Sequence, residues 1–278
     1  MINVLFSGNK GVFDGVLTCA LSILKRSTLD EGVAFYILTM DVSHLNEKYV
    51  PISPAQIAYL DGVVKEYSPE NRVEAIDVTD LYQQYFAGCP NEGAYCSPYT
   101  LLRLFADLLP LPDKLLYLDV DILFQRDVRL LYDTDVSQVE YAAARDHYGK
   151  YLIRPDYINA GVLLFNLARM RETGILQKAR EWICTKKLVF ADQSALIRST
   201  TCKKMLPQRF NDQKFLHRHT VVRHFSKRLF WLPYPHTDNV KQWQVTRVHK
   251  VFGYDQFDDI LYEYVYRKEK FDREINHE

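Results

Sequence analysis

The sequence predicts an α/β protein whose central sheet is mostly parallel and covered by helices. Strand and helix signals alternate along the chain, which is the rhythm of repeated βαβ units. The expected strands are short and apolar, as strands in a buried sheet are. The chain has 278 residues, of which 47% are hydrophobic and 25% charged, so it can bury the sizeable core of one large domain.

The first half of the chain carries the clearest alternation. Apolar runs predict strands, and apolar residues at helical spacing predict helices, with Ser53 as the N-cap of the second helix and Pro110 ending the third. The expected elements are, in order, a strand over 2–7, a helix over 12–25, a strand over 33–39, a helix over 54–67, a strand over 73–78, a helix over 99–109 and a strand over 115–118.

Two aspartates, Asp119 and Asp121, interrupt an apolar run that otherwise predicts one buried strand. Burying carboxylates is costly unless they are paired or hold a metal. An Asp-x-Asp pair at a strand end suits a hard divalent cation such as Mg²⁺ or Mn²⁺. In parallel sheets, ligands bind beyond this end of the strands. No strand leads into the second such pair, Asp133 and Asp135, which predicts a turn or a helix cap.

The second half continues the α/β pattern with three polar interruptions. A buried strand is expected over 161–165, followed by a helix through about residue 184 that Asn166 caps. Asn159, just before that strand, is either a turn residue or a site residue. Asp192 opens a further helix, where it is either an N-cap or a site residue. A short strand over 221–225 contains His224.

A local basic excess lies between residues 203 and 228, where eight Lys or Arg residues face one acid, Asp212. In a chain with 35 basic and 35 acidic residues, this excess indicates either an anionic ligand such as a diphosphate or a solvated basic face. No nucleic-acid recognition signature accompanies it, which argues against a nucleic-acid partner. His224, in the same segment, is either a core histidine or the third metal ligand.

The remaining signals concern location. The five cysteines, among them Cys96, lack zinc or redox spacing, which predicts reduced thiols in a cytoplasmic protein. The first strand begins without a basic leader, and no apolar run reaches the ~18 residues of a membrane span. A Tyr-rich helix over 257–271 is expected to pack on the body of the protein, the alternative being a peripheral contact at the inner membrane face.

Six short blocks, in this order, resemble glycosyltransferase family 8, the retaining sugar-nucleotide transferases. The resemblance runs from Val4 to about Phe225 and is carried by residues 99–104, 113–121, 159–167, 192–193, 209–211 and 224–225. It implies a GT-A fold, in which a Rossmann-like nucleotide-binding half is fused to an acceptor half around one sheet. The implied boundaries are a single catalytic domain over 1–253, divided into halves at about residue 125, and a C-terminal helical element over 254–278.

The resemblance also implies roles for individual residues. By matching position, Asp119, Asp121 and His224 would hold Mn²⁺, or Mg²⁺, against the diphosphate of a UDP-sugar. Gln193 would lie beneath the anomeric carbon. The residues implied to contact the donor sugar are Arg103, Asp146, Asn159 and Asp192, and those implied at the nucleotide are Ser7, Gly8, Asn9, Asp119 and Val120.

The chain departs from the family pattern at two places. Asn9 and Val12 stand where family members carry an acid and a tyrosine near the uracil, so Phe13 becomes a candidate for stacking on the base. The stretch after His224 lacks the usual glycine and has an insertion over 231–239. The diphosphate-binding basic residue is therefore open among three candidates, Lys227, Arg228 and Lys241.

The expected activity is Mn²⁺-dependent transfer of glucose or galactose from a UDP-sugar to a glycan, lipid-linked or protein-linked acceptor, with retention at the anomeric carbon. An amide is a poor nucleophile, so Gln193 favours front-face attack over a covalent intermediate on Asp192. Two alternatives stay open. They are a metal-dependent sugar nucleotidyltransferase, whose Gly-rich phosphate loop is only faintly matched over 6–11, and a non-catalytic carbohydrate-binding relative.

Overall fold

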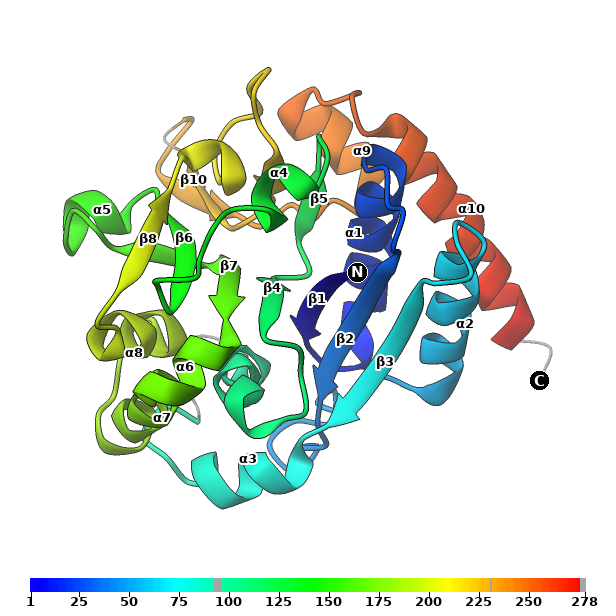
Figure 1. The fold of residues 1–278 in the computed structure, drawn as a ribbon. Helices are drawn as coiled ribbons and strands as arrows, with labels where there is room; N and C mark the ends of the chain where they lie inside the picture. Colours follow the sequence, from blue (N-terminus) through cyan, green and yellow to red (C-terminus); the bar gives the residue numbers. More distant parts are fainter. Residues whose placement is uncertain (93–96, 231, 276–278) are drawn as a thin grey trace.

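A seven-stranded sheet with the strand order β3-β2-β1-β4-β7-β6-β8 forms the centre of the molecule (Figure 1). This computed structural model describes residues 1–92, 97–230 and 232–275, so Cys96 and Trp231 lie outside the described residues. Four of the six strand pairings are parallel. The predicted α/β class with a mostly parallel sheet is therefore confirmed.

Four parallel strands form one half of the sheet: β1 (Ile2–Ser7), β2 (Val33–Thr39), β3 (Arg72–Asp77) and β4 (Lys114–Leu118). The connections between them include α1 (Phe13–Arg26), α2 (Pro54–Lys65) and α3 (Thr79–Phe86). Ser53 caps α2 in a capping box with Gln56, as the sequence predicts. Because these strands run the same way, their carboxyl ends meet at one edge of the sheet.

The other half of the sheet reverses direction. Strand β7 (Ile158–Asn166) is antiparallel to β4, β6 (Tyr141–Arg145) is antiparallel to β7, and β8 (Lys203–Leu206) is parallel to β6. As a result, the carboxyl end of β4 lies beside the start of β7, where Leu118 pairs with Val162. Side chains from both halves of the sheet meet at this junction.

Two short ladders lie outside the main sheet. In the first, β5 (Ile122–Phe124) pairs with β9 (Val222–His224), and Ile122 is opposite His224. In the second, β10 (Arg228–Phe230) forms an antiparallel hairpin with β11 (His236–Asp238). The β5–β9 ladder brings residue 224 back to residues 119–121, about one hundred positions earlier in the chain.

Two helix predictions are corrected, and one of the two alternatives for Asp192 is excluded. The expected helix through residue 184 is two helices, α6 (Leu167–Thr173) and α7 (Ile175–Thr185), because Gly174 adopts a left-handed conformation with φ 64° between them. Residues 98–108 form a 3₁₀ run rather than an α-helix. Helix α8 (Ala191–Ser199) begins after Phe190, and Asp192 does not cap it. The shorter elements are η1 (Lys10–Val12), η2 (Pro98–Leu108), α4 (Arg129–Tyr132), α5 (Gly149–Leu152), η3 (Gln208–Phe210), α9 (Val245–Arg247) and η4 (Val248–Phe252).

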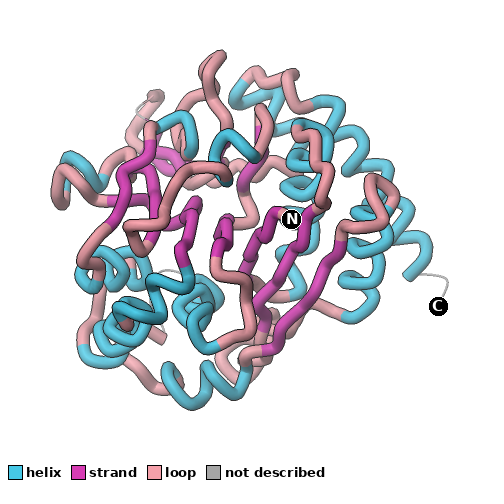
Figure 2. Tube along the Cα trace, in the orientation of Figure 1, coloured by secondary structure: helices cyan, strands magenta, loops and turns pink. Residues whose placement is uncertain are grey.

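Helices cover both faces of the sheet, and the core consists of one apolar layer on each face (Figure 2). Along β1, Val4 and Phe6 pack in one layer and Leu5 in the other. This placement explains why the strands are apolar at nearly every position instead of alternating with polar residues.

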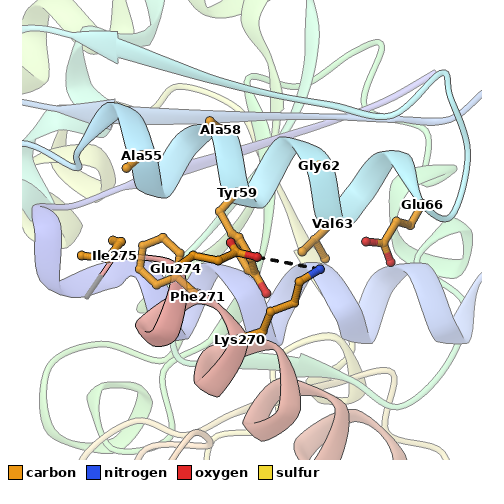
Figure 3. Close-up of a pocket in the computed structure, with 10 residues that line it drawn as sticks. All are labelled: Ala55, Ala58, Tyr59, Gly62, Val63, Glu66, Lys270, Phe271, Glu274 and Ile275. Carbon is orange, nitrogen blue, oxygen red and sulfur yellow. Dashed lines mark ion pairs between the residues drawn. The ribbon is translucent and has the colours of Figure 1, made fainter. Parts of the chain in front are cut away.

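The last helix, α10 (Asp258–Ile275), lies along α1 and α2 (Figures 1 and 3). Phe271 stacks on Phe13 at 4.5 Å between ring centroids and meets Tyr59 at 4.9 Å. Lys25 and Arg26 of α1 form ion pairs with acids of α10. The expected packing of this segment on the body of the protein is confirmed. Within the described residues, no helix is both long and apolar enough to cross a membrane.

Candidate active site

Asp119, Asp121 and His224 lie together at the carboxyl end of β4, and one ligand atom from each lies within 4.8 Å of the others. Asp119 is the first residue after β4, Asp121 immediately precedes β5, and His224 ends β9. The His224 Nε2 atom is 3.1 Å from Asp121 Oδ1 and 3.9 Å from Asp119 Oδ2. The structure thus brings together the three residues that the sequence predicts as metal ligands.

The hydrogen bonds of His224 leave one ring nitrogen for a ligand. Its Nδ1 lies 3.0 Å from Asn211 Oδ1, so an Nδ1–H tautomer donates there and Nε2 points to the two aspartates. Asn211 Nδ2 in turn donates to Asn159 Oδ1, and Asn159 Nδ2 donates to Asp146 Oδ2. Metal-binding histidines are commonly held in this way by a polar partner. The same chain of bonds links the candidate metal ligands to two residues expected at the donor sugar.

Gly161 provides the space for this cluster. A Cβ atom at residue 161 would overlap His224 Cε1 and lie 2.7 Å from Asp119 Oδ2. The backbone of Gly161 also accepts a hydrogen bond from Asp119 N at 2.8 Å. Two carboxylates and an imidazole in a cradle of this kind fit Mn²⁺, which accepts oxygen and nitrogen ligands.

A segment from near the C-terminus closes one side of the cluster. Lys241 Nζ forms an ion pair with Asp121 Oδ2. Gln242 is fully buried and donates from Nε2 to the carbonyl oxygen of Val120 at 2.7 Å. Burial alone would raise the pKa of Asp121, but His224 and Lys241 outweigh it and hold that pKa well below its ordinary value. Asp121 is therefore ionised in the folded protein, as a metal ligand must be.

Arg103 is buried between two carboxylates. It donates to Asp119 Oδ1 at 3.0 Å, lies 3.3 Å from Asp192 Oδ2 and stacks over the ring of Tyr117 at 4.0 Å. Burial and the charge of Asp119 raise the pKa of Asp192, while Arg103 opposes them. Asp192 is 6% exposed, so it is a buried carboxylate whose position is fixed by its neighbours. Its partner is the guanidinium of Arg103, and it is the second residue of α8, one position past the start of the helix and two past the N-cap Phe190.

The amide of Gln193 lies beside these groups and is anchored by the start of β7. Its Oε1 accepts a hydrogen bond from the backbone N–H of Ala160 at 3.0 Å. Asp146 accepts bonds from the backbone N–H groups of Tyr148 and Gly149, in addition to that from Asn159. Four expected sugar-site residues from β7, α8 and the loop after β6 are thus fixed by backbone or side-chain partners.

The loop after β1 is held by hydrogen bonds of Asn9 and by the close packing of Gly8. Asn9 accepts from Gly11 N at 3.0 Å and donates to the carbonyl oxygen of Lys48 at 2.9 Å. A Cβ at residue 8 would overlap Val12, so glycine is needed there for the close approach of η1. Phe13 is 3% exposed and packs against Phe271, which removes it as a candidate for stacking on a base.

The two other basic candidates lie elsewhere. Lys227 and Arg228 line a cavity of about 820 Å³ that also reaches Asp146 and Asn159. Of the three candidates for the diphosphate, only Lys241 contacts a predicted metal ligand among the ion pairs of the described residues.

A second hollow, of about 390 Å³, lies between α2 and α10 (Figure 3). Tyr59 and Phe271 are among its lining residues, and Lys270 and Glu274 pair at 4.0 Å one turn apart along α10. It contains none of the predicted site residues. We interpret it as a gap between two packed helices.

Sequence reasoning missed two contributors to the site. Asn211 belongs to a block already noted, but only the position of His224 shows that it orients the imidazole. Gln242 stands beside Lys241, and nothing in its residue type indicates that it holds the loop between the two aspartates. Both roles depend on contacts between segments far apart in the chain.

The arrangement defines a class of site: two aspartates and a histidine suited to a divalent cation, with a lysine suited to an anionic ligand such as a phosphate. The family model described as "Glycosyl transferase family 8" matches residues 3–217. The chain therefore belongs to glycosyltransferase family 8, as its sequence blocks predict.

Curated relatives agree with this assignment. A "Putative glycosyltransferase" of Haemophilus influenzae is 26% identical over 76% of this chain and 63% of its own length. "Probable galacturonosyltransferase-like 4" of Arabidopsis thaliana is 24% identical over 67% of this chain and 55% of its own length. The chain thus spans roughly three fifths of these relatives.

Solved structures show the same fold. An active-site mutant of LgtC matches with a TM-score of 0.68 at 21% identity, covering 93% of this chain and 95% of that one. GlyE of Streptococcus pneumoniae TIGR4 matches with a TM-score of 0.63 at 18% identity, covering 96% of this chain and 65% of that one. The fold is the GT-A fold of these enzymes.

Proposed function

We propose that this glycosyltransferase moves a hexose, glucose or galactose, from a UDP-sugar to a glycan or glycoconjugate acceptor, with Mn²⁺ and with retention. The observation that carries the proposal is the cluster of Asp119, Asp121 and His224 beside Lys241. In the LgtC structure solved with donor and acceptor sugar analogues, a similar fold belongs to a galactosyltransferase. That likeness supports transfer chemistry over the nucleotidyltransferase and non-catalytic alternatives.

In this proposal, the two aspartates and His224 hold the cation, and Lys241 moves from Asp121 to the diphosphate. When bound, Mn²⁺ supplies Lewis-acid stabilisation of the charge that builds on the leaving diphosphate. The ammonium group of Lys241 adds to that stabilisation. Ser7, Gly8, Asn9 and Val120 would contact the nucleotide, and Arg103, Asp146, Asn159 and Asp192 the sugar.

The environment of Gln193 and Asp192 favours front-face attack. Asp192 is engaged by Arg103, and an amide forms no stable ester, so neither is a ready covalent nucleophile. The bond from the anomeric carbon to the phosphate oxygen breaks while the acceptor oxygen forms its bond on the same face. The acceptor proton passes to the leaving phosphate oxygen, and the dipole of Gln193 stabilises positive charge on the sugar.

We further propose one catalytic domain over 1–253, with its nucleotide half ending near residue 125, and a helical element over 254–278. We place the enzyme in the cytoplasm, where a UDP-sugar donor is present. Contact with the inner membrane face would give it access to a lipid-linked acceptor.

The test of the reaction class is release of UDP. With Mn²⁺ and the correct UDP-sugar, the protein should release UDP slowly without an acceptor, because water can intercept the activated sugar. EDTA should abolish this release. Release of pyrophosphate from UTP and a sugar phosphate, without release of UDP, would instead identify a nucleotidyltransferase. The absence of both products would identify a non-catalytic binding protein.

Gln193→Ala tests the front-face mechanism. Removing one electrostatic stabiliser should lower kcat by about 10- to 1000-fold while the Kd for the UDP-sugar changes little. Single-turnover kinetics and direct titration separate these two quantities. A variant that loses donor affinity but keeps its turnover rate would contradict the role given to Gln193.

A further inference from the structure

Arg223 stands next to the candidate metal ligand His224 in β9 and is fully buried. Because successive residues of a strand point to opposite faces, the two side chains lie on opposite faces of β9. Among the residues that the structure describes, no carboxylate forms an ion pair with Arg223, and its Nε and Nη2 atoms have no hydrogen-bond partner. Burying a guanidinium without a carboxylate is costly, so the contacts that it does make need an explanation.

The hydrogen bonds of Arg223 join two backbone segments at the candidate metal site. Its Nη1 donates to the carbonyl oxygen of Asp212 at 2.8 Å and to that of His224. The same segments meet in a short parallel bridge, in which Asp212 N donates to Val222 O at 2.9 Å and His224 N donates to Asp212 O at 3.0 Å. Asp212 follows Asn211, which bonds to the His224 imidazole. One guanidinium nitrogen therefore ties the strand that carries the ligand to the segment that orients it.

Aromatic rings, rather than a carboxylate, surround the guanidinium of Arg223. Its central carbon lies 4.9 Å from the ring centroid of Phe225, 5.6 Å from that of Phe252 and 5.7 Å from that of Tyr254. The faces of aromatic rings attract a guanidinium, and more strongly where water is excluded. Phe252 ends η4 and Tyr254 lies between η4 and α10, so two of the three rings come from the segment before the last helix.

Phe252 also contacts a second arginine. The guanidinium carbon of Arg228, the first residue of β10, lies 5.0 Å from the ring centroid of Phe252 and 5.2 Å from that of Phe230. The ring of Phe252 is thus shared between β9 and the β10–β11 hairpin. Through Arg223, the packing of the segment before α10 is connected to the backbone of His224.

We propose that Arg223 is a positioning residue for the candidate metal ligand His224 and that Phe252 holds Arg223 in place. The guanidinium fixes the carbonyl oxygens of Asp212 and His224, and with them the backbone on both sides of the Asn211–His224 hydrogen bond. The segment before α10 then supports the metal site, although none of the three candidate ligands lies in it. This inference rests on the proposed role of His224 and adds the residues that hold it.

Hydrogen exchange without metal or nucleotide tests the position of the strand. Arg223→Met removes the donor and keeps an unbranched side chain. The backbone amides of Asp212 and His224, which form the bridge, should exchange about 10-fold faster or more, while those of β1 should be unchanged. Nuclear magnetic resonance resolves these amides. Faster exchange in β1 as well would mean that Arg223 supports the whole fold, and unchanged exchange at Asp212 and His224 would mean that it holds neither. Either result would overturn the proposal.

The affinity for Mn²⁺ tests the consequence for the site. With UDP present, Arg223→Met should bind Mn²⁺ about 10-fold more weakly, because a displaced imidazole fits the cation less well. Phe252→Leu keeps an apolar side chain but removes the shared ring, so its loss should be about 3- to 10-fold. Tyr85→Leu is the matched control and should leave Mn²⁺ binding unchanged. Tyr85 is likewise a half-buried aromatic residue against a buried arginine, Arg180 at 5.3 Å, but it lies in α3.

Electron paramagnetic resonance of free Mn²⁺ measures these affinities. Wild-type affinity in Arg223→Met would overturn the role of Arg223, wild-type affinity in Phe252→Leu the role of Phe252, and an equal loss in Tyr85→Leu both roles. If Arg223→Met does not fold, Phe252→Leu is measured by both methods and decides alone. The proposed function fails in a different way, because the unmodified protein would then show no UDP-dependent binding of Mn²⁺, whereas hydrogen exchange needs neither ligand.

Discussion

At the scale of single residues, the candidate metal site depends on a position that carries no side chain. Gly161 lies against the side chains of His224 and Asp119, so a Cβ at residue 161 would force these two side chains to move. His224 is also fixed by Asn211 on its other side. The geometry of the ligand set is therefore determined by a glycine as much as by the ligands.

Gly161→Ala should weaken Mn²⁺-dependent UDP binding by about 10- to 100-fold, because the methyl group displaces two ligands by tenths of an ångström or more. Calorimetric titration of UDP at saturating Mn²⁺ measures the effect. Gly62→Ala in α2, where a Cβ meets nothing within 4 Å, is the matched control and should leave UDP binding unchanged. Near-normal UDP binding in Gly161→Ala would show that the metal site lies elsewhere.

Replacing Lys241 is expected to strengthen the binding of Mn²⁺ and to weaken the binding of UDP. In the structure its ammonium occupies one oxygen of Asp121, so a cation must compete with it. Lys241→Gln should therefore bind Mn²⁺ about 3- to 10-fold more tightly without nucleotide and bind UDP more weakly with Mn²⁺ present. Electron paramagnetic resonance of free Mn²⁺ measures the first quantity, and UDP titration measures the second. A change of the same sign in both would rule out the proposed movement of Lys241 from Asp121 to the diphosphate.

At the scale of elements, the connections before β6 and β8 are held together by one buried carboxylate. Glu140 accepts hydrogen bonds from Thr200 Oγ1 at 2.6 Å, from Thr201 N and Oγ1 at 3.0 Å each, and from Cys202 N at 3.3 Å. Burial raises the pKa of Glu140, but the hydrogen bonds from the threonines outweigh it and lower the pKa below the ordinary 4.5.

Glu140→Gln should lower the free energy of unfolding by about 1–3 kcal/mol near pH 7, since an amide cannot accept all four bonds. A folded pKa below the unfolded value means that the wild type has its full advantage above about pH 4.5 and loses it as the pH falls through the folded pKa. Urea unfolding at several pH values measures this. Glu172→Gln, at an exposed ion pair in α6, is the control and should change stability by less than about 0.5 kcal/mol. A Glu140→Gln deficit that stays constant down to pH 3 would contradict the argument.

The sequence predicts the elements well where local signals decide. Apolar runs locate β1 and β2 to the residue, and Ser53 marks the start of α2. The apolar pattern continues across Gly174, so it predicts one helix where the structure has two, although a glycine within a helical pattern is itself a signal of a break. The reversed direction of β7 and the pairing of β5 with β9 depend on contacts between distant segments, which residue spacing does not encode.

Some residues of the candidate site can likewise be predicted from local sequence, and others only from the fold. Residue type and flanking apolar runs single out Asp119 and Asp121, whereas His224 is predicted as a ligand only through the family resemblance. The structure places the three side chains together. The three basic candidates separate only in the fold, where Lys241 pairs with Asp121 while Lys227 and Arg228 line the side cavity. For the same reason the role of Asn211 was invisible in the sequence.

At the scale of the whole molecule, the candidate metal site ties together segments from nearly the full length of the chain. Asp119 and Asp121 follow β4, Gly161 lies in β7, His224 ends β9, and Lys241 comes from the segment before α9. Lys241 is continuous with Gln242, whose bond to Val120 O joins this segment to the loop that follows β4. A ligand that bridges these segments binds the folded state alone and must stabilise it.

Mn²⁺ and UDP together should therefore raise the thermal midpoint by more than the sum of their separate effects. At a UDP concentration of 100 times Kd, the stabilisation is about 2.7 kcal/mol, which corresponds to roughly 5–10 °C for a chain of this size. Asp121→Ala should lose the synergy, because it removes both a metal ligand and the partner of Lys241. Glu172→Ala, away from the site, should keep it. Additive shifts in the unmodified protein would mean that metal and nucleotide bind independently, and the shared site over β4, β9 and residue 241 would then be wrong.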